Sequence, residues 1–131
     1  MFEECISLET IGNISAVALA KSCYAYMFKG CEKLTKVGNI SAVYVAFDPG
    51  YSTMFEECNA LEEVGMISVT HMNGLYYKNM FTNSSIIKFG GILNKPTKYG
   101  MNEQSVSLPD NCYESMFEGC EKLTSCGYIT L

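Results

Sequence analysis

One stretch of the chain, residues 24–40, recurs in whole or in part five times and constrains the fold more than any other feature. Every copy contains a Met-Phe pair, and the pairs begin at Met1, Met27, Met54, Met80 and Met116. The intervals between them are 26, 27, 26 and 36 residues. Near-equal intervals of this length are typical of a solenoid, in which each repeat contacts only its neighbours. We therefore expect a single domain over residues 1–131, with units starting at about residues 1, 27, 54, 80 and 116.

Alignment on the Met-Phe pair gives columns of similar residues. After the pair come a Cys or Ser, a Leu or Ile, a further mostly apolar position, a Gly and an Ile; in the second unit these are Cys31, Leu34, Val37, Gly38 and Ile40. The fourth unit keeps this register only with a one-residue deletion after Ser84. Because like residues recur in register, we expect successive coils to stack so that Phe28 contacts Phe2 and Phe55.

Two periods alternate within each unit. Tyr24, Met27, Phe28 and Cys31 are spaced i, i+3, i+4 and i+7, which predicts one face of a short helix. Residues 34–40 are predicted to be extended, with a bend near Gly38, where either a side chain would clash or φ is positive.

A second extended piece is expected at residues 17–19, 43–45, 69–72 and 106–108. Its alternation predicts that Val and Leu or Met face inward, whereas Ala18, Tyr44, His71 and Ser107 face outward. Strands of neighbouring coils are expected to pair in parallel, about 4.8 Å apart.

The pattern Met-Phe-x-x-Cys-x-x-Leu-x-x-Val-Gly-x-Ile, with Tyr three residues before Met, resembles the BspA-like subclass of leucine-rich repeats. The resemblance covers residues 1–131 apart from an insert at residues 94–103. It implies an α/β repeat fold, a short right-handed leucine-rich-repeat solenoid with a parallel β-sheet and one short helix per coil. Members of the family look like surface-exposed or secreted bacterial proteins with binding or adhesive roles. The resemblance therefore implies a non-catalytic interaction or adhesion module, and no catalytic residues are carried over.

Composition excludes several classes of function. The net charge is −5 with nine Lys and Arg residues, and no basic run is present, so nucleic acid is not an expected partner. No apolar run approaches the roughly 18–20 residues of a membrane span. No signal peptide is visible, so we expect either a cytoplasmic protein or a piece of a longer chain exported to the cell surface.

The seven cysteines do not form a complete disulfide framework, because their number is odd, and their spacing does not match a zinc site. Four of them, Cys5, Cys31, Cys58 and Cys120, occupy one inward column, where a free Cys is a small apolar residue. The only histidine, His71, lies on a different column, so a Cys–His enzyme is not expected. We expect no catalytic residue, no metal and no cofactor.

Glutamates and asparagines also recur at fixed positions. The glutamates, among them Glu56, Glu57 and Glu63, are expected to form a solvated acidic face; a stacked calcium site is the alternative, although the glycine-rich calcium motif of solenoids is missing. Asn13 and Asn39 each begin an Asn-Ile-Ser acceptor pattern for glycosylation. They are alternatively expected to form a side-chain amide ladder between coils.

The insert is the one place where the chain departs from its own repeat, and insertions in solenoids often project from the binding face. Its Lys95, Lys98, Tyr99 and Met101 form one candidate contact patch on an acidic protein; the alternative is a loop without function. Tyr44 and His71 form a second candidate, a lateral surface patch.

Both terminal units present apolar columns, whereas solenoids normally end in polar capping repeats. We therefore expect a homo-oligomer, formed either by coil-on-coil stacking or by a two-fold pair. The leading hypothesis is a module that binds a protein or glycan ligand. The alternative is a self-assembling structural unit whose ligand is a second copy of itself.

Overall fold

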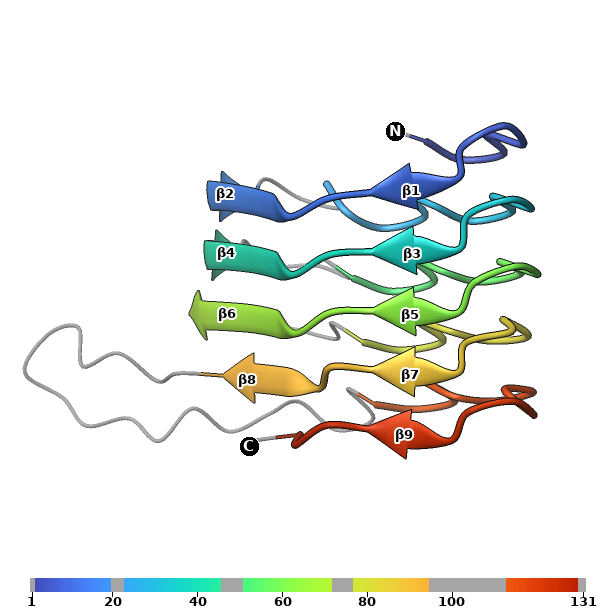
Figure 1. Ribbon diagram of the computed structural model, residues 1–131. Helices are drawn as coiled ribbons and strands as arrows, with labels where there is room; N and C mark the ends of the chain where they lie inside the picture. The colour runs from blue at the N-terminus through green and yellow to red at the C-terminus, as the bar shows by residue number, and fades with distance from the viewer. Residues whose placement is uncertain (1, 20–22, 46–50, 72–76, 95–112, 130–131) are drawn as a thin grey trace, which may run out of the picture.

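The computed structural model describes residues 2–19, 23–45, 51–71, 77–94 and 113–129, which form stacked coils with parallel strands (Figure 1). The short strands form sheet A in the order β1-β3-β5-β7-β9: Thr10–Ile11, Lys36–Val37, Glu63–Val64, Lys88–Phe89 and Ser125–Cys126. The longer strands form sheet B in the order β2-β4-β6-β8: Ile14–Leu19, Ile40–Val45, Ile67–His71 and Ile92–Asn94.

Each coil contributes one strand to sheet A and, after a bend, the next strand to sheet B. In the last coil, which is described as far as Ile129, a bridge between Ile129 and Ile92 lies at that place. The pairing is parallel and in register, so Ile40 lies between Ile14 and Ile67. Glu63 pairs with Lys88, and Ser84 and Ile86 are buried at the places of Cys58 and Leu61. The one-residue deletion of the fourth unit therefore lies directly after Ser84, as predicted. The repeat solenoid is confirmed, but it has two parallel sheets where one was expected.

The core consists of the columns that the repeat predicted. The ring of Phe28 stacks between those of Phe2 and Phe55, with centroid distances of 5.6 and 5.4 Å. The second and third coils bury the same positions completely, with 0% exposure at Phe28, Cys31, Leu34, Ile40, Phe55, Cys58, Leu61 and Ile67. Burial of apolar side chains at about 25 cal/mol per Å² is the main contribution that holds the coils together.

The predicted helix is wrong wherever the structure describes that segment: residues 23–30 and their counterparts form successive turns, and no helix lies within the described ranges. The cause is the left-handed backbone of two residues in each turn segment of the second to fifth coils, and of Glu4 in the first. In the second coil these are Tyr26, with φ 57°, and Gly30, with φ 69°. An α-helix cannot pass through a left-handed residue, whatever the spacing of its apolar side chains. The apolar periodicity correctly indicated which side chains are buried, but it did not indicate a helical backbone.

Backbone hydrogen bonds between coils replace the bonds that a helix would have made internally. The amide of Phe28 donates to the carbonyl of Met54 at 3.0 Å, and the amide of Gly30 donates to the carbonyl of Glu56 at 3.0 Å. Within the segment, the amide of Cys31 donates to the carbonyl of Phe28 at 3.1 Å. The turn segments therefore form a hydrogen-bonded third side of the solenoid, which satisfies the backbone without helical structure.

The bend between the two sheets requires glycine because a side chain there would clash. Either such a clash or a positive φ was expected from the sequence. A Cβ on Gly65 would lie 2.8 Å from the backbone of Gly38 in the preceding coil, and its φ is not positive. The neighbouring asparagines form the predicted ladder in modified form. The Oδ1 of Asn13 accepts from the backbone amide of Asn39, and the Oδ1 of Asn39 accepts from that of Met66, both at 2.9 Å.

Candidate functional site

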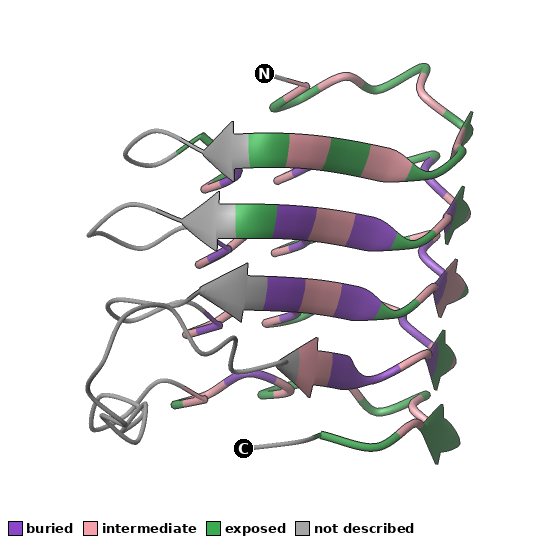
Figure 2. Ribbon diagram, turned by 90° about the vertical axis from the view of Figure 1, so that its left-hand side faces the viewer, coloured by how far each residue is buried: buried purple, intermediate pink, exposed green. Residues whose placement is uncertain are grey.

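Sheet B faces the viewer in Figure 2, and the described side chains on its outer face are uncharged and recur in register. Burial alternates along each strand, so that in β4 Ile40 and Ala42 are buried, whereas Ser41 is half-buried and Val43 is 46% exposed. In-register pairing lines up Ser15, Ser41 and Ser68, followed by Leu93. The outer face of sheet B is defined here by Ser15, Val17, Ser41, Val43, Ser68 and Leu93.

The valine prediction is corrected at two positions. Val17 is 78% exposed and Val43 is exposed, although both were expected to face inward; Val69 is buried as expected. The reason is the strand start: the strands begin at the inward isoleucines Ile14 and Ile40, and strict alternation from there places Ser and Val outside. Val69 is buried because it lies two residues after Ile67 and pairs with the buried Ala42, whereas Val17 and Val43 lie three residues after their isoleucines.

Sheet A has a different surface. Lys36, Glu63 and Lys88 lie in register on neighbouring strands, and the Nζ of Lys36 lies 3.1 Å from the Oε2 of Glu63. Both side chains of that ion pair are about half-exposed, so it contributes no more than about 1 kcal/mol. The six described side chains of the sheet B face carry no charge, whereas sheet A alternates in sign.

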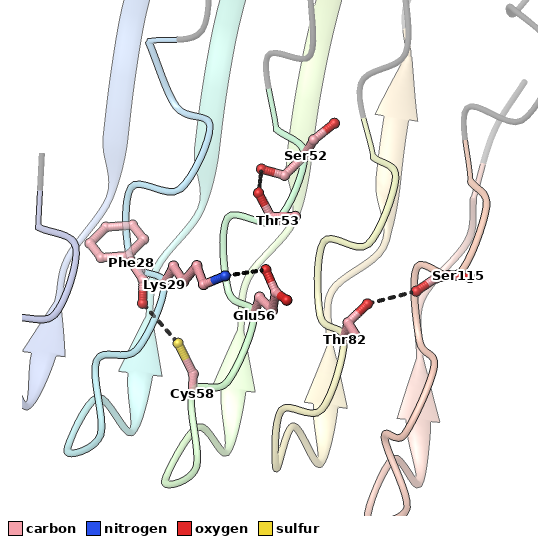
Figure 3. Close-up of polar contacts among 8 residues, drawn as sticks. All are labelled: Phe28, Lys29, Ser52, Thr53, Glu56, Cys58, Thr82 and Ser115. Atoms are coloured by element: carbon pink, nitrogen blue, oxygen red, sulfur yellow. Dashed lines mark hydrogen bonds and ion pairs between the residues drawn. The ribbon is translucent and has the colours of Figure 1, made fainter.

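The turn side carries further ion pairs between coils. The Nζ of Lys29 lies 3.0 Å from the Oε2 of Glu56, as Figure 3 shows, and that of Lys78 lies 2.8 Å from the Oε2 of Glu114. The hydrogen bond to Glu56 raises the pKa of Lys29. Part of the predicted acidic face is therefore paired with lysines, while Glu57 and Glu62 are exposed as expected.

The inward cysteines make a hydrogen bond that the sequence did not reveal. The thiol of Cys58 donates to the carbonyl of Phe28 in the preceding coil at 3.0 Å (Figure 3), and Cys31 and Cys120 make the equivalent bonds to Phe2 and Phe81. Burial raises the pKa of the Cys58 thiol to about 12 and also raises that of Cys31. A thiol held in its protonated form by burial is a poor nucleophile.

The predicted contact residues have mixed outcomes. Lys95, Lys98, Tyr99 and Met101 lie outside the described residues. Tyr44 and His71 are paired in register on β4 and β6, so their backbones are neighbours as the lateral patch requires. Their side chains lie outside the description, and the lateral patch stays a prediction. Tyr26, on the turn side of the second coil, is 49% exposed.

Sequence reasoning missed the exposed valines and the serine row beside them. The signal was present in the isoleucine column. Once Ile14 and Ile40 are assigned to the core, a period of two along the strand places Ser15 and Val17 on the outside.

Other kinds of site are not found in the part of the chain that the structure describes. No group of three or more His, Cys, Asp or Glu side chains there is arranged to hold a metal ion. None of the described segments is a helix with the length and apolar character of a membrane span. Comparisons of the chain with family models, with curated proteins and with solved structures gave no match.

Proposed function

We propose that the chain is a non-catalytic interaction module of the leucine-rich-repeat kind, resembling BspA-like surface proteins, and that it binds a protein partner on the outer face of sheet B. A position at the cell surface or in secreted form belongs to the same proposal. The observation that carries it is the contrast between this uncharged face and the charged surface of sheet A.

The sheet B face offers apolar area that folding leaves uncovered. Val17 is 78% exposed although it lies in a strand whose inward neighbours pack against the core. The exposed valines and the serines beside them can be buried against a flat apolar surface of a partner without desolvating a charged group. The ladder of parallel strands keeps this face rigid, so little conformational entropy is lost when a partner binds.

A protein partner fits the described face better than a glycan does. The outward side chains that the structure describes in β2 and β4 are serine hydroxyls and valine methyl groups, with no aromatic ring among them for a sugar to stack on. Aliphatic rows favour burial against apolar side chains of another protein.

The cysteines support a role without catalysis. Burial raises the pKa of Cys31, Cys58, Cys120 and Cys126, which is opposite to the activation of a nucleophilic thiolate. The thiols of Cys31, Cys58 and Cys120 donate to backbone carbonyls of the preceding coil rather than to a base. These three thiols therefore have a structural role in joining coils.

The experiment is a binding assay with matched charge insertions. The labelled chain is first screened against arrays of extracellular-matrix proteins and glycans, and the strongest ligand is then measured with Val17→Lys on sheet B and Thr10→Lys on sheet A. Both positions are exposed, lie in the first coil and receive the same charge. We expect Val17→Lys to weaken binding at least tenfold, because the new ammonium group must be desolvated at the interface.

Thr10→Lys should leave the affinity within about twofold. Equal losses in both variants, or no loss in Val17→Lys, would contradict the assignment to sheet B. A variant lacking residues 95–103 separates this face from the insert: if only that deletion abolishes binding, the ligand contacts the insert instead.

A further inference from the structure

We infer that a second copy of this chain stacks head to tail on the first, with the last coil of one copy against the first coil of the next, in the register that the coils use within the chain. This interaction is separate from the binding proposed for sheet B. The interface would repeat contacts that the solenoid already makes four times.

The two outermost coils bury their core columns less completely than the inner coils do. In the second coil Phe28, Cys31 and Leu34 are all 0% exposed. The same positions are only partly buried in the first and last described coils, at Phe2, Cys5 and Leu8 and at Phe117, Cys120 and Leu123. In the 131-residue chain each of these two coils therefore presents one half of a coil-on-coil contact.

The two halves are complementary by the rule of the repeat. Stacking in register would place the Phe117 ring of one copy on the Phe2 ring of the next, as Phe28 stacks on Phe55 within the chain. The amide of Gly119 would donate to the carbonyl of Glu3, as the amide of Gly30 donates to that of Glu56 at 3.0 Å. A contact between two different surfaces is not a two-fold pair, and because the coils stack along one direction, it adds copies in a line.

The column of residues that follows each phenylalanine places like charges at this contact, and this repulsion makes the contact testable. The residue after the phenylalanine is, coil by coil, Glu3, Lys29, Glu56, Thr82 and Glu118. Within the chain this column forms the ion pair between Lys29 and Glu56, at 3.0 Å (Figure 3). Between copies it would bring the exposed carboxylates of Glu118 and Glu3 together, and like charges at that spacing repel. Association is therefore expected to be weak at low ionic strength and stronger in salt.

The experiment is a charge-swap cycle measured by sedimentation equilibrium on the 131-residue chain. Glu118→Lys and Glu3→Lys should each strengthen association by about three- to tenfold, because either one recreates the Lys–Glu pair seen at Lys29 and Glu56. The double variant should associate as weakly as the unmodified chain, because it restores a like-charge pair. Glu121→Lys is the matched control: it changes the same charge in the same coil, but its column partner is the uncharged Ile6.

Average mass that increases with concentration without a plateau, together with this cycle, supports the inference. A plateau at twice the chain mass would overturn it in favour of a two-fold pair. A chain that stays monomeric at about 1 mM in low and high salt, in every variant, would overturn it completely. An equal effect of Glu121→Lys and Glu118→Lys would overturn the register. Val17→Lys should leave association unchanged, so failure here and failure of the sheet B proposal are distinguishable.

Discussion

Glycine occurs at two places in the coils, the bend between the sheets and the turn segment, for different reasons. At the bend between the sheets, residues 38, 65, 90 and 127 are all glycine, because each packs against the backbone of the preceding coil. In the turn segment, the second left-handed position carries Glu4, Gly30, Glu57, Asn83 and Gly119. The left-handed turn position therefore accepts several residue types at a modest cost in free energy. The bend accepts only glycine, because a Cβ there would clash with the backbone of the preceding coil.

The largest expected effect tests the bend. Gly65→Ala would place a Cβ within 2.8 Å of the backbone of Gly38 and Asn39, neither of which can move without breaking the ladder between coils. We expect the free energy of unfolding to fall by about 3 kcal/mol or more, measured by urea denaturation.

The first coil supplies the control for this substitution. Gly12 occupies the same column, but a Cβ there would meet nothing within 4 Å. Gly12→Ala should change the free energy of unfolding by no more than about 1 kcal/mol, with a gain possible through the unfolded chain. If the two variants were equally destabilised, the cause would be backbone conformation and the steric account of the bend would be wrong.

The second effect concerns the end of the turn, where Cys58 donates to the carbonyl of Phe28. Its folded-state pKa is raised from an ordinary 9.0 to about 12 by burial, so the folded protein keeps a proton that the unfolded chain releases. This stability is fully present below about pH 9 and is lost as the pH rises toward 12. The expected slope is about 1.4 kcal/mol per pH unit for this one group.

Cys58→Ser should reduce that slope, because a serine hydroxyl does not titrate in this range while it keeps a donor for the carbonyl of Phe28. The fourth coil already has Ser84 in this column, where it is buried with 3% exposure. Urea denaturation at pH 8 and pH 10.5 measures the difference. An identical pH dependence in the variant would show that Cys58 is not held protonated in the folded state.

The same contrast explains what the sequence could and could not predict. The register was predictable because like residues must meet in a solenoid, and Phe28 does stack between Phe2 and Phe55. The helix was not, because Tyr24, Met27, Phe28 and Cys31 are buried at helical spacing by a chain of turns. At the left-handed positions, Gly30, Asn79, Asn83 and Gly119 are of residue types that favour this conformation, whereas Tyr26, Thr53 and Glu57 are not.

The candidate site was missed for a related reason. The exposure of Val17 follows from where β2 begins, and that start is set by the bend after Gly12 rather than by the composition of the strand. Counting the alternation from the valines instead placed them inside. The pairing of Tyr44 with His71, in contrast, followed directly from the repeat.

The smallest effect tests the turn corner with a stabilising substitution. Glu57 has φ 60°, which costs a residue with a side chain about 1–2 kcal/mol relative to glycine. Glu57→Gly removes that strain but adds about 0.5–1 kcal/mol of chain entropy in the unfolded state, so we expect a net gain of about 0.5 kcal/mol. Urea denaturation should be done in about 0.3 M salt, which screens the attraction between Glu57 and Lys29.

Glu62→Gly is the matched control: Glu62 is exposed without a positive φ, so glycine there should destabilise by about 0.5–1 kcal/mol. Opposite signs at two glutamates five residues apart would show that the turn corner selects for backbone conformation alone, whereas equal losses would mean that the Glu57 side chain stabilises the turn enough to outweigh its strain.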